Sequence, residues 1–202
     1  MGWLTGLKSL RGYPGLAGKL RSAALVTILA LVGIVSLTSP TWGQIDWFLA
    51  HRFAVVKTIS TVQLAQALLH DRQHPQAPQL VLLDIRSAEE FAVSHLPGAR
   101  HVAPDTVVDF AERELAALDR SQPIVVYCSV GVRSAAAARD LQFLGFSQVK
   151  NLRGSLFQWA NEGRVVEAGV RGGVEAQVSS GVAVHPYNRF WGRLLRTPER
   201  PG

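Results

Sequence analysis

Cysteine is nearly absent from this chain: among 202 residues there is one, Cys128. A single cysteine excludes an intrachain disulfide framework, a cysteine-rich zinc module and a Cys-x-x-Cys redox pair. The six histidines are scattered, and only His70 and His74 have the i, i+4 spacing of two ligands on one helix face. His74 precedes Pro75 and no further ligand follows, so we expect a solvated helix end there and no metal site. Any chemistry of Cys128 therefore proceeds without a second cysteine from this chain.

Acidic residues are absent from the first 43 positions, which carry four basic ones, and are outnumbered six to three over residues 164–202. The formal charge of +6 therefore comes from the two ends, since residues 44–163 hold 11 basic and 12 acidic side chains. A nucleic-acid-binding surface needs its positive charge gathered on the folded domain. The near-neutral middle argues against such a surface, and we expect no nucleic acid as partner.

An apolar run of fifteen residues without a charge occupies positions 23–37. As a helix it would be about 22 Å long, shorter than the roughly 30 Å of a bilayer core. A basic start, this run and small residues just before Gln44 fit a signal peptide with a cut before Gln44. The basic segment is long and Trp42 is unusual at a cleavage site, so an uncleaved membrane anchor over residues 23–42 is the alternative. Both interpretations predict export, to the periplasm or an equivalent compartment.

From residue 60 onward, short apolar runs alternate with segments of helical spacing. The runs at 80–83, 124–127 and 148–151 predict buried strands of a parallel sheet. Helices are expected at residues 60–69, 106–118 and 134–144, the first of them capped by Ser60 or Thr61. Strands and helices at this spacing predict the fold class: α/β, an open parallel sheet with helices on both faces, preceded by the N-terminal hydrophobic helix.

Two chemically notable residues follow two of these strands: Asp84 and Cys128. The carboxyl ends of parallel strands meet at one edge of the sheet, where ligands bind, so we expect both residues there. A helix beginning after Cys128 and the guanidinium of Arg133 would stabilise a thiolate and lower the pKa of Cys128. Gly131 lets the loop turn so that its N–H groups converge as an anion-binding nest. Ser134 is expected either to cap the helix or to donate to the sulfur.

The stretch from Cys128 to Ser134 reads C-S-V-G-V-R-S and resembles the active-site loop of single-domain rhodanese-like sulfurtransferases. Other stretches agree with that family in order and spacing: residues 84–86 with its Asp-x-Arg, 89–91 with its acidic-aromatic turn, 95–99 with its His-x-Pro-Gly-Ala, and 145–159 with its closing strand and tryptophan-bearing helix. The resemblance covers residues 58–165. It implies a rhodanese-like fold, in an exported or membrane-anchored member of the family.

The resemblance also implies a chemistry. Cys128 would take sulfane sulfur from a small donor, thiosulfate-like or a persulfide, and pass it to a thiol, a cyanide-like acceptor or a partner protein. The active-site loop would comprise Ser129, Val130, Gly131, Val132, Arg133 and Ser134, whose amides steady the persulfide. Asp84 and Arg86 are expected to support the neighbouring loop through an ion pair, and Arg133 to point inward toward a carboxylate or backbone carbonyls. The cycle needs no metal or organic cofactor.

Two other functions stay open at this point. The chain could act as a non-enzymatic sulfur carrier or docking module of rhodanese type. Phosphatases and arsenate reductases of the Cys-x5-Arg type also set a thiolate in a nest with a trailing arginine. Here four residues separate Cys128 from Arg133, and the shorter loop suits a single sulfur better than a tetrahedral oxyanion.

The sequence thus predicts three segments. These are a signal peptide or membrane anchor (1–43), a rhodanese-like domain (44–165) and a C-terminal extension (166–202). Aromatic and arginine residues gather in the extension between positions 184 and 195. We expect this stretch to pack back on the domain, with contact to a membrane surface as the alternative.

Overall fold

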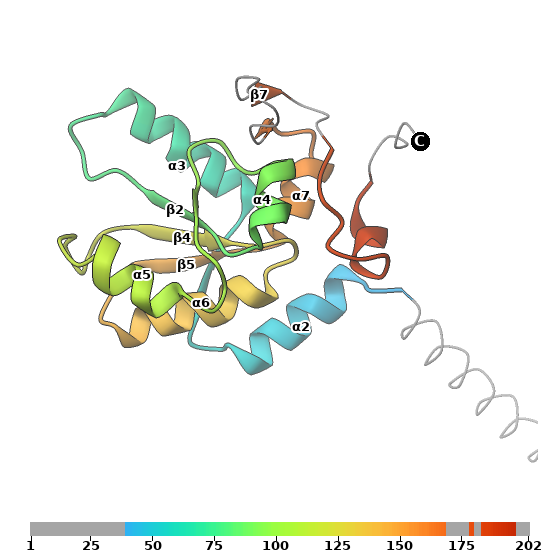
Figure 1. The fold of residues 1–202 in the computed structure, drawn as a ribbon, viewed down its shortest axis with the longest axis horizontal. Helices are drawn as coiled ribbons and strands as arrows, with labels where there is room; N and C mark the ends of the chain where they lie inside the picture. The colour runs from blue at the N-terminus through green and yellow to red at the C-terminus, as the bar shows by residue number, and fades with distance from the viewer. Residues whose placement is uncertain (1–38, 169–177, 180–182, 197–202) are drawn as a thin grey trace, which may run out of the picture. The chain divides into compact units, whose positions relative to one another are not determined.

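The computed structural model describes residues 39–168, 178–179 and 183–196 (Figure 1). The apolar run at 23–37, expected to form an N-terminal hydrophobic helix, lies outside these residues. Within the described part of the chain, no helix combines the length and the apolar character that crossing a membrane requires.

A five-stranded parallel sheet forms the centre of the domain. In order across the sheet, its strands are β1 (Lys57–Ile59), β5 (Val149–Leu152), β4 (Ile124–Tyr127), β2 (Val81–Asp84) and β3 (Arg100–His101). The three strands predicted from apolar runs are β2, β4 and β5, and the structure confirms them with ends within one residue of those expected. A second, antiparallel pair joins β6 (Val166–Glu167) and β7 (Val178–Ser179).

Helices cover both faces of the sheet, as the sequence predicts (Figure 1). On one face lie α3 (Thr61–Gln73) and α7 (Ser155–Asn161), and on the other lie α5 (Val107–Glu114) and α6 (Val132–Phe143). In addition, α2 (Trp42–Arg52) contacts α6, and α4 (Ala88–Val93) follows β2. Ser60 caps α3 as expected, because its Oγ accepts from the backbone N–H of Gln63 at 3.2 Å.

The apolar strands are buried on both sides because their successive side chains point to opposite faces. Leu82 and Val125 pack with α3 and α7. Their neighbours Leu83 and Val126 pack with α5 and α6. This double coverage is why the strands read as continuous apolar runs rather than as alternating patterns.

Two segments outside residues 58–165, the stretch that carries the family resemblance, also contribute to the core. Helix α2 buries Ile45 and Leu49 in the cluster that holds α7. Val184 and Leu194 of the C-terminal extension are buried in the same cluster. The aromatic stretch therefore packs back on the domain, which is the first of the two arrangements considered from sequence.

Candidate active site

Cys128 lies at the carboxyl edge of the sheet, directly after β4, as predicted. Asp84 ends the adjacent strand β2 and pairs in register with Tyr127, the residue before Cys128, so the two lie at the same edge. The cysteine is 1% exposed. Helix α6 begins at Val132, and a thiol close to a helix N-terminus is in a setting that stabilises a thiolate.

Two backbone carbonyls of the loop accept hydrogen bonds from α7. The carbonyl of Cys128 accepts from the N–H of Leu156 at 3.1 Å, and that of Ser129 from the N–H of Phe157 at 3.0 Å. Both donors are in the first turn of α7, whose amides have no partner within their own helix. With the carbonyls held by α7, the amides of the loop are free to face the thiol.

Gly131 turns the loop in a conformation that suits glycine. Its φ is 104°, which a residue with a side chain rarely adopts. A Cβ there would lie 3.4 Å from Leu49 Cδ1 of α2 and 3.6 Å from Asn151 Nδ2. The N–H of Gly131 donates to Cys128 Sγ at 3.1 Å, and its carbonyl accepts from Asn151 Nδ2 at 2.9 Å. The turn thus aims one amide at the sulfur.

These surroundings hold the pKa of Cys128 below its usual value. Burial has the largest single influence and raises the pKa, because it penalises the charged thiolate. The positive charge of Arg133, the hydroxyl of Ser134 and the backbone amides of Ser134 and Gly131 lower it by more in sum. The predicted combination of helix start, guanidinium and amide nest is therefore present around this sulfur.

Ser134 does not cap α6, which corrects one expectation drawn from the sequence. The helix begins two residues earlier, at Val132, with Gly131 in the capping position. The Ser134 hydroxyl lies near the sulfur and donates to Asn151 Oδ1 at 2.7 Å. Asn151 presents this oxygen because its nitrogen donates to the Gly131 carbonyl. Both the hydroxyl and the backbone amide of Ser134 act to lower the pKa of Cys128, which agrees with the alternative expectation that Ser134 donates to the sulfur.

Arg133 points inward and pairs with a carboxylate, as expected. Its Nη1 and Nη2 donate to the two oxygens of Glu90 at 2.7 and 2.8 Å, and Nη2 also donates to Ser129 Oγ at 2.9 Å. Ser129 Oγ in turn donates to Glu90 Oε1 at 2.8 Å. Burial acts to raise the pKa of Glu90, but the hydrogen bonds from Arg133 and Ser129 lower it to about 2. The network ties α4 to the first turn of α6.

Asp84 and Arg86 form the expected ion pair. Arg86 Nε and Nη2 donate to the two carboxylate oxygens at 2.8 and 2.6 Å, and both side chains are fully buried. Nη2 also donates to the Ser94 carbonyl at 2.6 Å. Burial and the Asp84 charge raise the pKa of the neighbouring Tyr127 well above its usual value. This pair fixes the segment that follows β2.

The other two loop side chains are apolar anchors. Val130 is buried with residues of α3 and α7. Val132 is half-buried and lines an apolar pocket of about 330 Å³ with Ile45 of α2 and Trp191 of the C-terminal extension. Neither presents a polar side-chain group, so these two residues offer the site only their backbone amides.

Three residues of the site were not predicted to take part: Glu90, Asn151 and Tyr187. Ser87 and Glu90 have the spacing of a capping box, which the structure contains at the start of α4, but this spacing predicts a helix start and no contact with Arg133. Asn151 and Tyr187 had no signal in the sequence, since they reach the loop from β5 and from the C-terminal extension. The Tyr187 ring centroid lies 4.6 Å from Arg133 Cζ.

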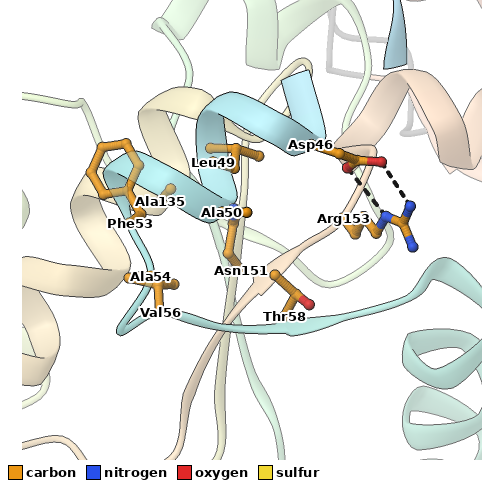
Figure 2. A pocket seen from close by; sticks show the side chains of 10 residues that line it. All are labelled: Asp46, Leu49, Ala50, Phe53, Ala54, Val56, Thr58, Ala135, Asn151 and Arg153. Atoms are coloured by element: carbon orange, nitrogen blue, oxygen red, sulfur yellow. Dashed lines mark hydrogen bonds and ion pairs between the residues drawn. The ribbon is translucent and has the colours of Figure 1, made fainter. Parts of the chain in front are cut away.

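Behind the loop, α2 and the sheet enclose a second pocket, of about 370 Å³ (Figure 2). Asn151 lines this pocket together with Leu49 and Ala135. An ion pair between Asp46 and Arg153, with 2.7 Å between Oδ2 and Nη2, lies at one end. Asn151 thus borders the pocket and, through Gly131, holds the cysteine loop.

His95 contacts its own segment and β6. Its Nδ1 lies 3.0 Å from the carbonyl oxygen of Phe91, and its Nε2 lies 3.7 Å from a carboxylate oxygen of Glu167. Among the residues that the structure describes, no three histidine, cysteine or acidic side chains come together as metal ligands.

Comparison with known proteins places this site in a protein family. A family model described as "Rhodanese-like domain" matches residues 63–162. "Thiosulfate sulfurtransferase GlpE" of Pseudomonas aeruginosa is 40% identical over 78 residues, which are 39% of this chain and 67% of the relative. The chain belongs to the rhodanese-like family. Its Cys128 loop lies inside the matched stretch.

Other rhodanese-like relatives differ in length. "Probable adenylyltransferase/sulfurtransferase MoeZ" of Mycobacterium tuberculosis is 34% identical over 84 residues, 42% of this chain and 21% of that protein. This chain therefore spans about a fifth of the length of that relative. Among solved structures, a rhodanese-like domain protein from Staphylococcus aureus is 27% identical, with a TM-score of 0.46 over 57% of this chain and 100% of that one.

Proposed function

We propose that this rhodanese-like chain is a sulfurtransferase that carries sulfane sulfur as a persulfide on Cys128. The observation that carries the proposal is the nest around the thiol. Arg133 and the amides of Gly131 and Ser134 lower the pKa of the Cys128 thiol. Two carbonyls of the loop are bound by amides of α7. A site that stabilises a thiolate equally stabilises the terminal anion of a persulfide.

The reaction is a two-step displacement. In the first step, the Cys128 thiolate attacks the outer sulfur of a donor; a new S–S bond forms, and the bond between that sulfur and the rest of the donor breaks. The leaving group, sulfite in the case of thiosulfate, departs with the electron pair. In the second step, a thiol or cyanide attacks the terminal sulfur of the persulfide and regenerates the thiolate. No external oxidant or reductant is needed.

Intact-mass measurement tests the proposal. The purified chain is incubated with thiosulfate or with mercaptopyruvate, and Cys128→Ser is treated in parallel. We expect a gain of one sulfur atom in the native chain, its removal by cyanide, and no gain in the variant. Failure of every donor to add sulfur to Cys128 would overturn the enzyme. A persulfide that forms but leaves only to a partner protein would favour the sulfur-carrier function instead.

We also propose that the chain is exported and held at a membrane by residues 23–42. The basic start and the apolar run at 23–37 support export. Retention of this segment is favoured by α2, because a cut before Gln44 would remove Thr41, whose side chain accepts from the Gln44 backbone N–H at 3.3 Å. Cell fractionation with mass analysis of the mature N-terminus tests this. Recovery in the cytoplasmic fraction would refute export, and a mature chain starting at Gln44 would refute the anchor.

A further inference from the structure

The segment of residues 183–196, here called the strap, is fastened to the domain at both ends. Near its start, Ser94 Oγ donates to the Ala183 carbonyl at 2.9 Å. Near its end, Asn161 Nδ2 donates to the Leu194 carbonyl at 2.8 Å, and Asn161 Oδ1 accepts from the N–H of Arg196 at 2.6 Å. In Figure 1 the strap is drawn in red and runs beside α4 and α7. The strap is therefore held against the domain at both ends.

Between these fastenings, the strap holds Tyr187 in an uncommon backbone conformation. Its φ is 61°, in the left-handed region that residues with a side chain seldom occupy. The surrounding turn maintains it: the Tyr187 N–H donates to His185 Nδ1 at 3.0 Å, and Asn188 Oδ1 accepts from the N–H groups of Phe190 and Trp191. Several hydrogen bonds thus fix the direction in which this one side chain leaves the strap.

Tyr187 covers the cation of the active-site loop. Its ring lies over the guanidinium of Arg133, 4.6 Å from Cζ to the ring centroid, within the range of a cation–π contact. The edge of the same guanidinium is occupied, since Nη1 and Nη2 donate to Glu90 and Ser129. The positive charge of Arg133 is thus balanced by a carboxylate and shielded on one face by an aromatic ring.

This cluster also sets which groups a donor meets first. Cys128 and Ser129 are buried, whereas the Arg133 side chain is 25% exposed and Tyr187 is 48% exposed. Glu90 is buried beneath them. A sulfur donor that approaches the cysteine past Arg133 therefore meets the Tyr187 ring before it reaches the amide nest.

We propose that Tyr187 is a specificity-determining residue that favours an organic persulfide over the thiosulfate dianion as sulfur donor. This inference rests on the proposed sulfur transfer. The carbon chain of an organic persulfide gains contact with the phenol ring. A dianion gains little, because Arg133, the only cation of the loop, already has Glu90 as its counter-charge. The dianion also carries one more negative charge than the organic persulfide, and that charge has to be desolvated.

With an organic persulfide as donor, the first step is the same kind of displacement as with thiosulfate. The Cys128 thiolate attacks the terminal sulfur of the persulfide RSSH. The S–S bond to R–S breaks, the R–S⁻ thiolate leaves with the electron pair, and the Cys128 persulfide remains. The proton on the transferred sulfur stays with it or passes to the departing thiolate, and no redox partner takes part.

The test measures the rate of sulfur loading on Cys128 by quenched intact-mass analysis, with cysteine persulfide and with thiosulfate as separate donors. Tyr187→Ala removes the ring, and Tyr187→Phe keeps it. Phe143→Ala is the matched control, because Phe143 is an exposed aromatic at the far end of α6. We expect Tyr187→Ala to lower the rate ratio of cysteine persulfide to thiosulfate about tenfold. The other two variants keep the native ratio.

Each other result has a definite meaning. A Tyr187→Ala variant that loses rate equally with both donors would show that the ring only supports Arg133, and would overturn the inference. An unchanged rate with both donors would also overturn it, because Tyr187 would then lie off the donor's path. If the native chain loads sulfur from neither donor, the proposed function itself fails, and this is seen before any variant is made.

Discussion

Two arginine–carboxylate pairs lie near the same edge of the sheet and serve different ends. The Asp84–Arg86 pair is completely buried and closes at 2.6 Å between residues two positions apart. The Glu90–Arg133 pair closes at 2.7 Å between residues 43 positions apart, and its arginine stays partly exposed. The distances are alike, so the pairs differ in what surrounds them.

The two arginines differ in role: Arg86 supports the fold, and Arg133 acts on the cysteine. Arg86 binds Asp84 and the Ser94 carbonyl, and these contacts fix the chain after β2. Arg133 joins two helices, and its charge also lowers the pKa of Cys128. A fully desolvated ion pair is a poor indicator of function, because its two charges neutralise each other. The pair that remains partly exposed is the one whose arginine lowers the pKa of Cys128.

Breaking the buried pair should produce the largest effect. Arg86→Met leaves the Asp84 carboxylate buried without its partner, and we expect a loss of about 3–5 kcal/mol in the free energy of unfolding. Urea denaturation followed by circular dichroism measures it. The exposed pair of Arg153 with Asp46 is the control, since Arg153→Gln should cost less than about 1 kcal/mol. Equal losses in the two variants would contradict the role given to burial.

The open pair should appear in the pH dependence of stability. The pKa of Glu90 is about 2 in the folded chain and near 4.5 ordinarily, so its ionised form stabilises the fold above pH 4.5. That contribution, about 3 kcal/mol, is lost as the pH falls from 4.5 toward 2. Glu90→Gln lacks the contribution and should show a shallower decline over this window in unfolding titrations. Parallel pH profiles for the native chain and the variant would refute it.

The smallest expected effect, a several-fold change in a reaction rate, is the most specific one on chemistry and comes from Arg133→Gln. Removing the guanidinium charge raises the pKa of Cys128, so the pH profile of its alkylation by iodoacetamide should move to higher pH and the neutral-pH rate should fall several-fold. Glutamine keeps a hydrogen-bond donor toward Glu90, which limits the structural change. If the profile stays in place, the amides of Gly131 and Ser134 alone set this pKa.

The three inner strands β2, β4 and β5 were predictable because their signal is local, whereas the short edge strands β1 and β3 were not predicted. Leu82 and Val125 belong to apolar runs whose length and spacing fix the strands β2 and β4, and the strand ends in turn place Cys128. The partner of Arg133 was less accessible. A carboxylate was expected, but its identity as Glu90 depends on how α4 packs beside α6, which no local pattern encodes. Tyr187 was out of reach for the same reason.

The start of α6 shows a subtler limit. Ser134 has the side chain of a typical helix cap, and the expected helix begins there. The structure begins the helix at Val132 because Gly131 adopts a positive φ and the Ser134 hydroxyl is engaged by Asn151. A residue on the neighbouring strand thus overrides the local preference. Preferences of single residues fail where a tertiary contact offers a better partner.

The strap has a consequence for how such a protein can change. Residues 183–196 lie outside the stretch at 63–162 that matches the family, yet they bring Tyr187 onto the entrance of the site. If Tyr187 sets the donor preference as proposed, selectivity is encoded apart from the reactive cysteine loop. An exchange of the strap alone would give a protein with the same reactive centre and a different preference, so new donors can be acquired by grafting a short segment while the cysteine loop stays untouched.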